Sequence, residues 1–287
     1  MANLQGAYLK LDWVDAEMAA LDEEIRTWGE ANGYTTTSDF YPEVNVVAIR
    51  VEFATPPPIF GVRFGNVIHC CRSALDYLVT DLVLLNENTP SEGPGGNQFP
   101  IYTEPLVSNR GDPVTFAEKT VRSLAGVHPD HVAMIEALQP YRPENYGDGT
   151  PNPLAGLAEL SNIDKHRVLH TLAAGLAPGQ EVDVIFAGEQ DVGHILKMHP
   201  ILIGPHVKAG AVLGCAEIVP CGPEPKMHIK AQLPTQLIFD GDHIGSGYAV
   251  WKSLANVADT TRAILDWFKP LFSGGVPGER PGPQPPA

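Results

Sequence analysis

The chain has 287 residues, of which 44% are hydrophobic and 18% are charged, and its formal net charge is −15. This composition excludes a disordered chain, which would combine low hydrophobicity with high charge, and it predicts a folded protein with a sizeable core. The acidic charge argues against a broad nucleic-acid-binding surface and against binding to anionic membranes, because both are polyanions.

Residues 8–31 form the first predicted helix. Its apolar residues recur at alternating spacings of three and four, which is typical of a narrow seam that packs against another long helix. The seam consists of Leu11, Val14, Met18, Leu21, Ile25 and Trp28. An intramolecular helical hairpin is the favoured interpretation, and a homodimer through helix 8–31 is the alternative.

Residues 34–54 predict a β-hairpin, because they are rich in β-branched and aromatic residues. Its second strand is expected at Val46–Phe53, and the prolines that follow end it. A second long helix is predicted over about 60–85, where a broad apolar stripe recurs at the helical period.

Two shorter helices are predicted at about 113–125 and 129–139, each with a proline and an acidic residue at its start. A third long helix is expected at about 154–175. Residues 181–240 contain short apolar runs separated by glycine and proline turns, which predict an antiparallel sheet. An amphipathic closing helix is predicted at 248–272.

These elements together predict an α+β fold, with a helical core of long amphipathic helices, an antiparallel β-sheet and a small N-terminal hairpin. We expect one elaborated domain over residues 1–272, comprising a helical part at about 8–175, a β-rich part at about 181–240 and the closing helix. Residues 273–287, rich in proline and glycine, are expected to form a disordered tail.

The sequence predicts a cytoplasmic location. The N-terminus lacks the basic and apolar regions of a signal peptide, and no apolar run is long enough to span a membrane. The four cysteines lack the spacing of a structural zinc site, so reduced thiols are the simpler interpretation.

Polar residues that are suited to chemistry concentrate on two of the predicted helices. On helix 60–85, His69, Arg72 and Asp76 share one face. Helix 154–175 carries five further candidate site residues. Three of them share one side of the helix, Asn162, His166 and His170, and two lie on its flank, Asp164 and Arg167. Lys165 is predicted near the middle of the apolar face, where a lysine needs a partner or a route to solvent.

Three interpretations of these two groups stay open. They are solvated helix faces, a buried polar network that fixes how the helices dock, or an active or ligand-binding site. His166 and His170, one turn apart, could hold a divalent metal, with His69 or Asp76 as a third ligand. Alternatively a histidine is a general base oriented by Asp76 or Asp164. Neither Ser73, which lacks a nucleophile-elbow context, nor Cys71, which lies in the apolar stripe, is expected to be a nucleophile.

Several short motifs resemble a group of uncharacterised bacterial proteins. The motifs are the segment from Phe64 to His69, the run Arg72-Ser73-Ala74-Leu75-Asp76, Phe99-Pro100-Ile101, Gln139-Pro140-Tyr141 and the segment from Leu160 to Arg167. The resemblance covers most of residues 10–270. It implies no established activity, but it implies that the two helical motifs belong to one recurring unit.

The leading functional hypothesis is an intracellular hydrolase, with or without a metal, whose site is the interhelical cluster. In this hypothesis His69, His166 and His170 are ligands or bases, Asp76 and Asp164 orient them, and Arg72 and Arg167 bind a small or anionic substrate. The alternative is a non-catalytic ligand-binding or assembly module whose cluster is structural. A third is a ribonuclease resembling HEPN proteins that uses Arg63 and His69, whose spacing matches the arginine–histidine pair of that group.

Overall fold

The computed structural model describes most of the chain. The described residues are 2–91, 96–108, 110–145, 152–166, 169, 171–175, 185–188, 192–200, 209–222, 227–230, 235–239 and 249–277. The residues beyond 277, most of the predicted disordered tail, lie outside this set. No helix in the described part of the chain is both long and apolar enough to cross a membrane.

The chain divides into two compact units. The first comprises Met1–Leu21, Ile59–Leu169 and Gly241–Ala287, and the second comprises Asp22–Pro58 and His170–Asp240. Helices make up most of the first unit and antiparallel strands most of the second, so the predicted α+β class is confirmed. The prediction of one elaborated domain over residues 1–272 stays a prediction.

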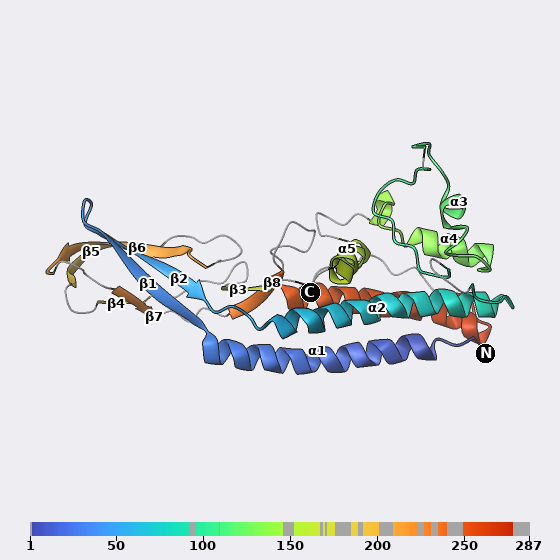
Figure 1. Ribbon diagram of the computed structural model, residues 1–287, viewed down its shortest axis with the longest axis horizontal. Coiled ribbons are helices and arrows are strands. Elements are labelled where there is room, and N and C mark those ends of the chain that lie inside the picture. Colours follow the sequence, from blue (N-terminus) through green and yellow to red (C-terminus); the bar gives the residue numbers. More distant parts are fainter. Residues whose placement is uncertain are drawn as a thin grey trace. The chain divides into compact units, whose positions relative to one another are not determined.

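Three long helices build the first unit: the part of α1 (Gln5–Asn32) up to Leu21, α2 (Pro58–Leu85) and α6 (Val250–Phe268). They lie side by side (Figure 1). Ion pairs at their edges connect α1 to both neighbours, Glu17 to Arg63 at 2.5 Å and Asp15 to Arg262 at 2.6 Å. The helices at 8–31, 60–85 and 248–272 were thus predicted almost at their observed bounds, with a short 3-10 helix η2 (Lys269–Ser273) after α6.

The predicted seam of α1 is used inside the chain. Its members in the first unit, Leu11, Val14, Met18 and Leu21, are all buried. Apolar residues at this spacing lie on one face of a helix. Burying one large apolar side chain stabilises the folded state by about 1.5–3 kcal/mol. These four residues therefore pack within the chain and are not available to a second copy.

The connections between α2 and α6 contain the shorter helices α3 (Phe116–Thr120), α4 (Pro129–Ala137), η1 (Pro143–Asn145) and α5 (Pro153–His166). The predicted helix at 113–125 is wrong in its bounds. Thr115 caps α3 by accepting from the Glu118 N–H at 3.3 Å, while Glu118 accepts from the Thr115 N–H at 2.8 Å. This reciprocal capping box fixes the helix start at Phe116, after the proline.

The predicted third helix at 154–175 is also wrong in its second half. The helix α5 ends at His166, and Thr171–Gly175 is strand β3, paired antiparallel with β8 (Thr235–Phe239). The partner strand lies more than sixty residues later in the sequence, so a local periodicity could not reveal it. His170 and Arg167 lie outside the described residues.

A four-stranded antiparallel sheet, in the order β1-β2-β6-β5, lies in the second unit. Its strands are β1 (Tyr34–Tyr41), β2 (Val46–Phe53), β5 (Val192–Pro200) and β6 (Val212–Pro220). The hairpin was predicted at its observed position, but it is not a separate small element, because β2 also pairs with β6. Strand β2 is an inner strand, paired with β1 on one side and with β6 on the other, and its residues Val47, Ile49 and Val51 are fully buried.

A second pair of short strands, β4 (Ile185–Gly188) and β7 (Met227–Lys230), is also antiparallel. The prediction of antiparallel strands over 181–240 is therefore confirmed for the described residues, although they are divided among three sheets. Asn45 ends the β1–β2 turn with a φ of 52°. Asparagine accepts this left-handed conformation more readily than most residues, which favours a turn at this point.

Candidate functional site

The polar face of α2 holds the backbone of a distant segment. Asp76 Oδ1 accepts the N–H of Phe99 at 2.9 Å, and Arg72 donates from Nη2 to the carbonyl of the same residue. The two side chains also face each other, with Nη2 and Oδ1 3.2 Å apart. Because Phe99 is fully buried, its backbone groups need protein partners, and Arg72 and Asp76 supply both.

Gln139 extends this arrangement along the same segment. Its side chain is fully buried, donates to the carbonyls of Pro100 and Ile135 at 3.0 Å each, and accepts the N–H of Tyr102 at 3.0 Å. The N–H of Tyr141 in turn donates to the carbonyl of Tyr102 at 3.0 Å. The segment Phe99–Tyr102, here called the clamped segment, is therefore fixed by polar groups from α2 and from the turn that follows α4.

Asp164 sits against α2 at Gly65. A Cβ atom added to Gly65 would lie 1.9 Å from Asp164 Oδ1 and 2.6 Å from its Cγ, so only glycine leaves room for this carboxyl group in its observed position. The approach explains why a glycine occurs inside a long helix, where it otherwise costs about 1 kcal/mol relative to alanine. It also brings α5 next to α2 (Figure 1) and places the Asp164 carboxyl group where the charge of His69 acts on it.

His69 lies one helical turn after Gly65 and one turn before Ser73. Its Nε2 atom is 3.4 Å from Ser73 Oγ, and its charge interacts with the carboxyl groups of both Asp164 and Asp76. The imidazole is exposed. Carboxyl, imidazole and hydroxyl groups thus follow one another along one side of α2, a row that we call the polar row: Asp164, His69 and Ser73.

The end of α5 adds two exposed candidates, Lys165 and His166. Lys165 continues the side of α5 that buries Leu157 and Ser161, as predicted, and its position one residue before the helix end gives its side chain the route to solvent that a lysine there needs. Its charge opposes the rise in the pKa of Asp76. The exposed position removes the cost of burying an unpaired ammonium group. Asn162 is exposed as well, so the polar side of α5 is a solvated face as far as the structure describes it.

Burial dominates the electrostatics of the buried half of the cluster. It raises the pKa of Asp76 above its ordinary value, although Arg72 and the Phe99 N–H act in the opposite direction. It also lowers the pKa of Arg72, against the attraction of Asp76. Burial likewise raises the pKa of Asp164, and His69 opposes this shift. Such perturbed carboxyl groups occur both in structural networks and in functional sites.

Of the predicted site residues, His69, Arg72, Asp76 and Asp164 come together at the α2–α5 contact, and His166 lies nearby at the end of α5. The metal prediction at His166 and His170 and the predicted role of Arg167 depend on residues outside the described set. Within that set, no three His, Cys, Asp or Glu residues are arranged to hold a metal ion.

Arg63, the arginine of the ribonuclease hypothesis, faces α1. It pairs with Glu17 at 2.5 Å, and both side chains are only 18% exposed. Six residues along a helix amount to about 240° of rotation, so Arg63 and His69 point in different directions. The ribonuclease hypothesis stays untested, but its two residues do not form one group in this structure.

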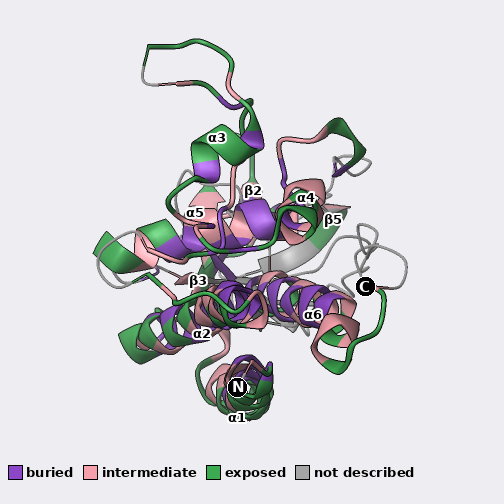
Figure 2. Cartoon of the chain, turned by 90° about the vertical axis from the view of Figure 1, so that its right-hand side faces the viewer, coloured by how far each residue is buried: buried purple, intermediate pink, exposed green. Residues whose placement is uncertain are grey.

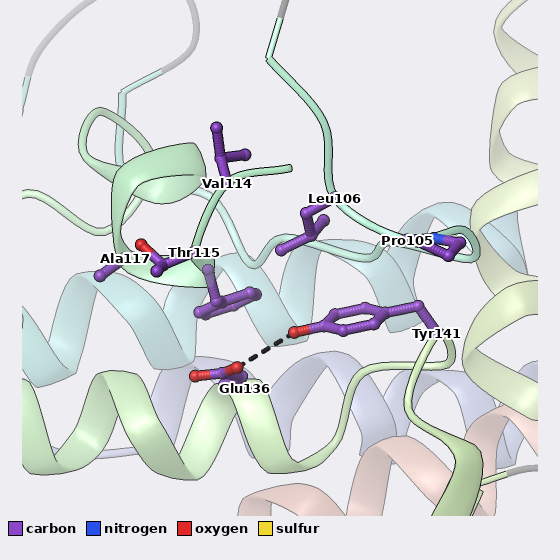
Figure 3. Close-up of a pocket in the computed structure, with 8 residues that line it drawn as sticks. Pro105, Leu106, Val114, Thr115, Ala117, Glu136 and Tyr141 are labelled. Atoms are coloured by element: carbon purple, nitrogen blue, oxygen red, sulfur yellow. Dashed lines mark hydrogen bonds between the residues drawn. The ribbon is translucent and has the colours of Figure 1, made fainter. Parts of the chain in front are cut away.

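A pocket of about 350 Å³ lies between α3, α4 and the loop before α3. Figure 3 shows the phenol of Tyr141 reaching across it to Glu136, and the distance from Tyr141 Oη to Glu136 Oε1 is 3.1 Å. The other lining residues are mainly apolar: Pro105, Leu106, Val114, Thr115, Phe116 and Ala117. Burial and the bond to Glu136 raise the pKa of Tyr141 to about 12, so the phenol stays protonated.

The sequence did not predict three features of the structure: the clamped segment, the buried Gln139 and this pocket. The only signals were the short motifs at Phe99-Pro100-Ile101 and Gln139-Pro140-Tyr141, for which no role was assigned. Ser73, which the structure brings within reach of His69, was not predicted as a site residue either. Comparisons with protein-family models, curated proteins and solved structures find no match to the chain.

Proposed function

We propose that the chain is a hydrolase in which His69 acts as the general base. The observation that carries this proposal is the polar row, in which an exposed imidazole lies between the Asp164 carboxyl group and the Ser73 hydroxyl group. A carboxylate beside a general-base histidine compensates the positive charge that the imidazole gains when it takes up a proton. In this proposal Arg72 and Asp76 are structural residues, because their partners are the backbone groups of Phe99.

The proposed step is simple acid–base chemistry. His69 Nε2 takes a proton from a water molecule while the water oxygen forms a bond to the carbonyl carbon or phosphorus of an ester. The bond from that atom to the leaving oxygen then breaks, and the imidazolium returns the proton to the leaving oxygen. Asp164 stabilises the transient imidazolium. Lys165 and His166, exposed at the end of α5, are suited to an anionic group on the substrate. The proposed step uses water and side chains alone.

Hydrolysis of chromogenic esters tests the proposal. We expect the wild type to hydrolyse at least one of p-nitrophenyl acetate, p-nitrophenyl phosphate and bis-p-nitrophenyl phosphate. His69→Gln should lower kcat/KM by about 10²–10⁴, the usual contribution of a general base, and should leave Tm unchanged because the side chain is exposed. His199→Gln, which changes a histidine of the second unit, is the matched control. Lack of activity against all three esters, or full activity in His69→Gln, would contradict the proposal.

A second candidate function is a non-catalytic ligand-binding module, and the pocket at Tyr141 favours it. Small-molecule sites have volumes of about 300–1,000 Å³, mostly apolar walls and a few polar groups, and this pocket matches that description. Glu136 and Tyr141 would select a small molecule with an apolar body and a hydrogen-bond donor. Screening a fragment library by thermal shift tests this: stabilisation should disappear in Leu106→Trp, which fills the pocket, and persist in His69→Gln.

We further propose that the protein works in the cytoplasm and does not coat nucleic acid. The support is the net charge of −15 and the four cysteines, each of which is a free thiol. Reduced thiols are typical of the cytoplasm. Localisation of a fluorescent fusion tests the first statement, and salt-dependent binding to duplex RNA and DNA tests the second.

A further inference from the structure

The hydroxyl group of Ser73 differs in its partner from three other hydroxyl groups on the long helices. Thr80 on α2 and Ser253 and Thr261 on α6 each donate to the backbone carbonyl one turn earlier, at 2.8–3.1 Å. This is a common way for a helix to engage a serine or threonine hydroxyl group. Ser73 Oγ instead lies 3.4 Å from His69 Nε2. The hydroxyl group is therefore directed at an imidazole and not at its own helix.

Ser73 points to the flank of α2 between α5 and α1. Figures 1 and 2 both show α5 and α1 on opposite sides of the layer that α2 and α6 form. Gly65 of α2 faces Asp164 of α5, and Arg63 of α2 pairs with α1. At 100° per residue Ser73 lies midway between these two directions, about 80° from each, and about 40° from His69. Since His69 is exposed and Ser73 is half-buried, a substrate can reach both side chains on this flank.

We propose that Ser73 is the nucleophile of the hydrolase, with His69 as its base and Asp164 as the carboxylate that compensates the imidazolium. The inference rests on the proposed function and adds a covalent intermediate to it. The polar row contains the three groups of a nucleophilic triad in the required order, with the imidazole between the carboxyl and hydroxyl groups. The distance of 3.4 Å exceeds the about 2.6–3.2 Å of a tight nucleophile–base pair, as is common before substrate binds.

The first half of the reaction transfers the acid group of an ester to Ser73. His69 Nε2 takes the proton of the Ser73 hydroxyl group while Oγ forms a bond to the carbonyl carbon or phosphorus. The bond from that atom to the leaving oxygen breaks, and the imidazolium gives its proton to the leaving oxygen, which departs as an alcohol. The acid group of the substrate is then held as an ester of Ser73.

The second half is the water step of the proposed function, with Ser73 Oγ as the leaving oxygen. His69 takes a proton from water, the water oxygen bonds to the carbon or phosphorus, and the bond from that atom to Oγ breaks. The proton returns to Oγ and the acid is released, so the free hydroxyl group is restored. Lys165, whose charge acts on Asp76 one turn after Ser73, is suited to stabilise the negative charge that develops in both halves.

Covalent capture of the full chain tests the proposal. Diisopropyl fluorophosphate, which transfers its phosphoryl group to activated serine hydroxyl groups, should label the wild type at Ser73, as located by peptide mass mapping. The label should be lost in Ser73→Ala, and it should form about 10²-fold more slowly in His69→Gln, because the hydroxyl group depends on the imidazole for activation. Ser253→Ala, which removes a half-buried hydroxyl group bound to a backbone carbonyl, is the matched control and should be labelled like the wild type. Absence of the label from Ser73 in the wild type overturns the proposal.

Hydrolysis kinetics separate a serine nucleophile from a water nucleophile. With the p-nitrophenyl ester that the wild type hydrolyses fastest, Ser73→Ala should lower kcat/KM by about 10²-fold or more, as His69→Gln does. The double variant should lose no more than either single variant, since nucleophile and base act as a unit. Ser73→Ala should keep the wild-type Tm, because alanine favours the helix.

Failure of this inference is distinguishable from failure of the proposed function. Wild-type activity in Ser73→Ala overturns the serine nucleophile and leaves His69 as the base for water. Labelling of Ser73 that depends on His69, in a wild type that hydrolyses no ester, contradicts the hydrolase and supports the nucleophile.

Discussion

The substitution Asp76→Ala tests whether the buried half of the polar cluster is a structural clamp. Asp76 Oδ1 accepts the Phe99 N–H at 2.9 Å and lies 3.2 Å from Arg72, and the exposed fractions of the Arg72 and Asp76 side chains are 18% and 28%. Alanine leaves a buried N–H without its acceptor, which costs about 1–3 kcal/mol. It also leaves a largely buried guanidinium without its counter-charge, which in a fully buried pair costs about 3–5 kcal/mol.

Because solvent still reaches both charged side chains, we expect the free energy of unfolding to fall by about 2–3 kcal/mol rather than by the full sum. For a unit of this size, 1 kcal/mol lowers Tm by about 2–4 °C, so the expected fall in Tm is about 4–12 °C. Differential scanning calorimetry measures this fall. Hydrogen exchange at the Phe99 amide should also accelerate by about tenfold or more, because opening of the clamped segment becomes easier.

Two variants control the experiment. Asp76→Asn keeps an oxygen acceptor for the Phe99 N–H and loses only the charge, so it should lower Tm less than Asp76→Ala. Asp12→Ala removes an exposed carboxylate from α1 and should leave Tm nearly unchanged. If Asp76→Ala lowers Tm no more than Asp12→Ala, and Phe99 exchanges at the wild-type rate, the clamp interpretation is refuted.

Three further substitutions test neighbouring parts of the cluster. Gln139→Leu should lower the free energy of unfolding by about 2–4 kcal/mol, measured by urea denaturation, because it removes three buried hydrogen bonds; a value equal to wild type would contradict this. Gly65→Ala should displace the Asp164 carboxyl group and reduce ester hydrolysis without loss of Tm, since alanine favours the helix. His69→Gln should raise the pKa of Asp164, followed by carboxyl-carbon NMR, because His69 lowers it in the wild type.

The long helices could be predicted because their signal is local. In α1 and α6 the buried residues recur at intervals of three and four, and burial in the helical core is what that pattern encodes. The β2 strand was equally clear, since Val47, Ile49 and Val51 are β-branched residues in a short run. In each case the apolar residues whose spacing predicts the helix or strand are the same residues that are buried in the structure.

The features that could not be predicted depend on distant partners. Strand β3 was taken for helix because its apolar residues suit either structure until β8 supplies the pairing. Arg72 and Asp76 look like an ordinary i,i+4 ion pair, and only the approach of Phe99, more than twenty residues later, gives them a buried role. The closeness of Gly65 to Asp164 likewise becomes evident only when α5 lies against α2.

This difference between buried and exposed groups determines where chemistry can occur in the cluster. A buried ion pair that also holds backbone groups is costly to disturb, so Arg72 and Asp76 are poorly suited to bind and release a substrate. His69, Lys165 and His166 are exposed, and a change in their protonation or a bound anion costs the fold little. In the proposed hydrolase the reactive half of the cluster is therefore its solvent edge. The clamped half keeps α2 and the segment at Phe99 in fixed positions beneath it.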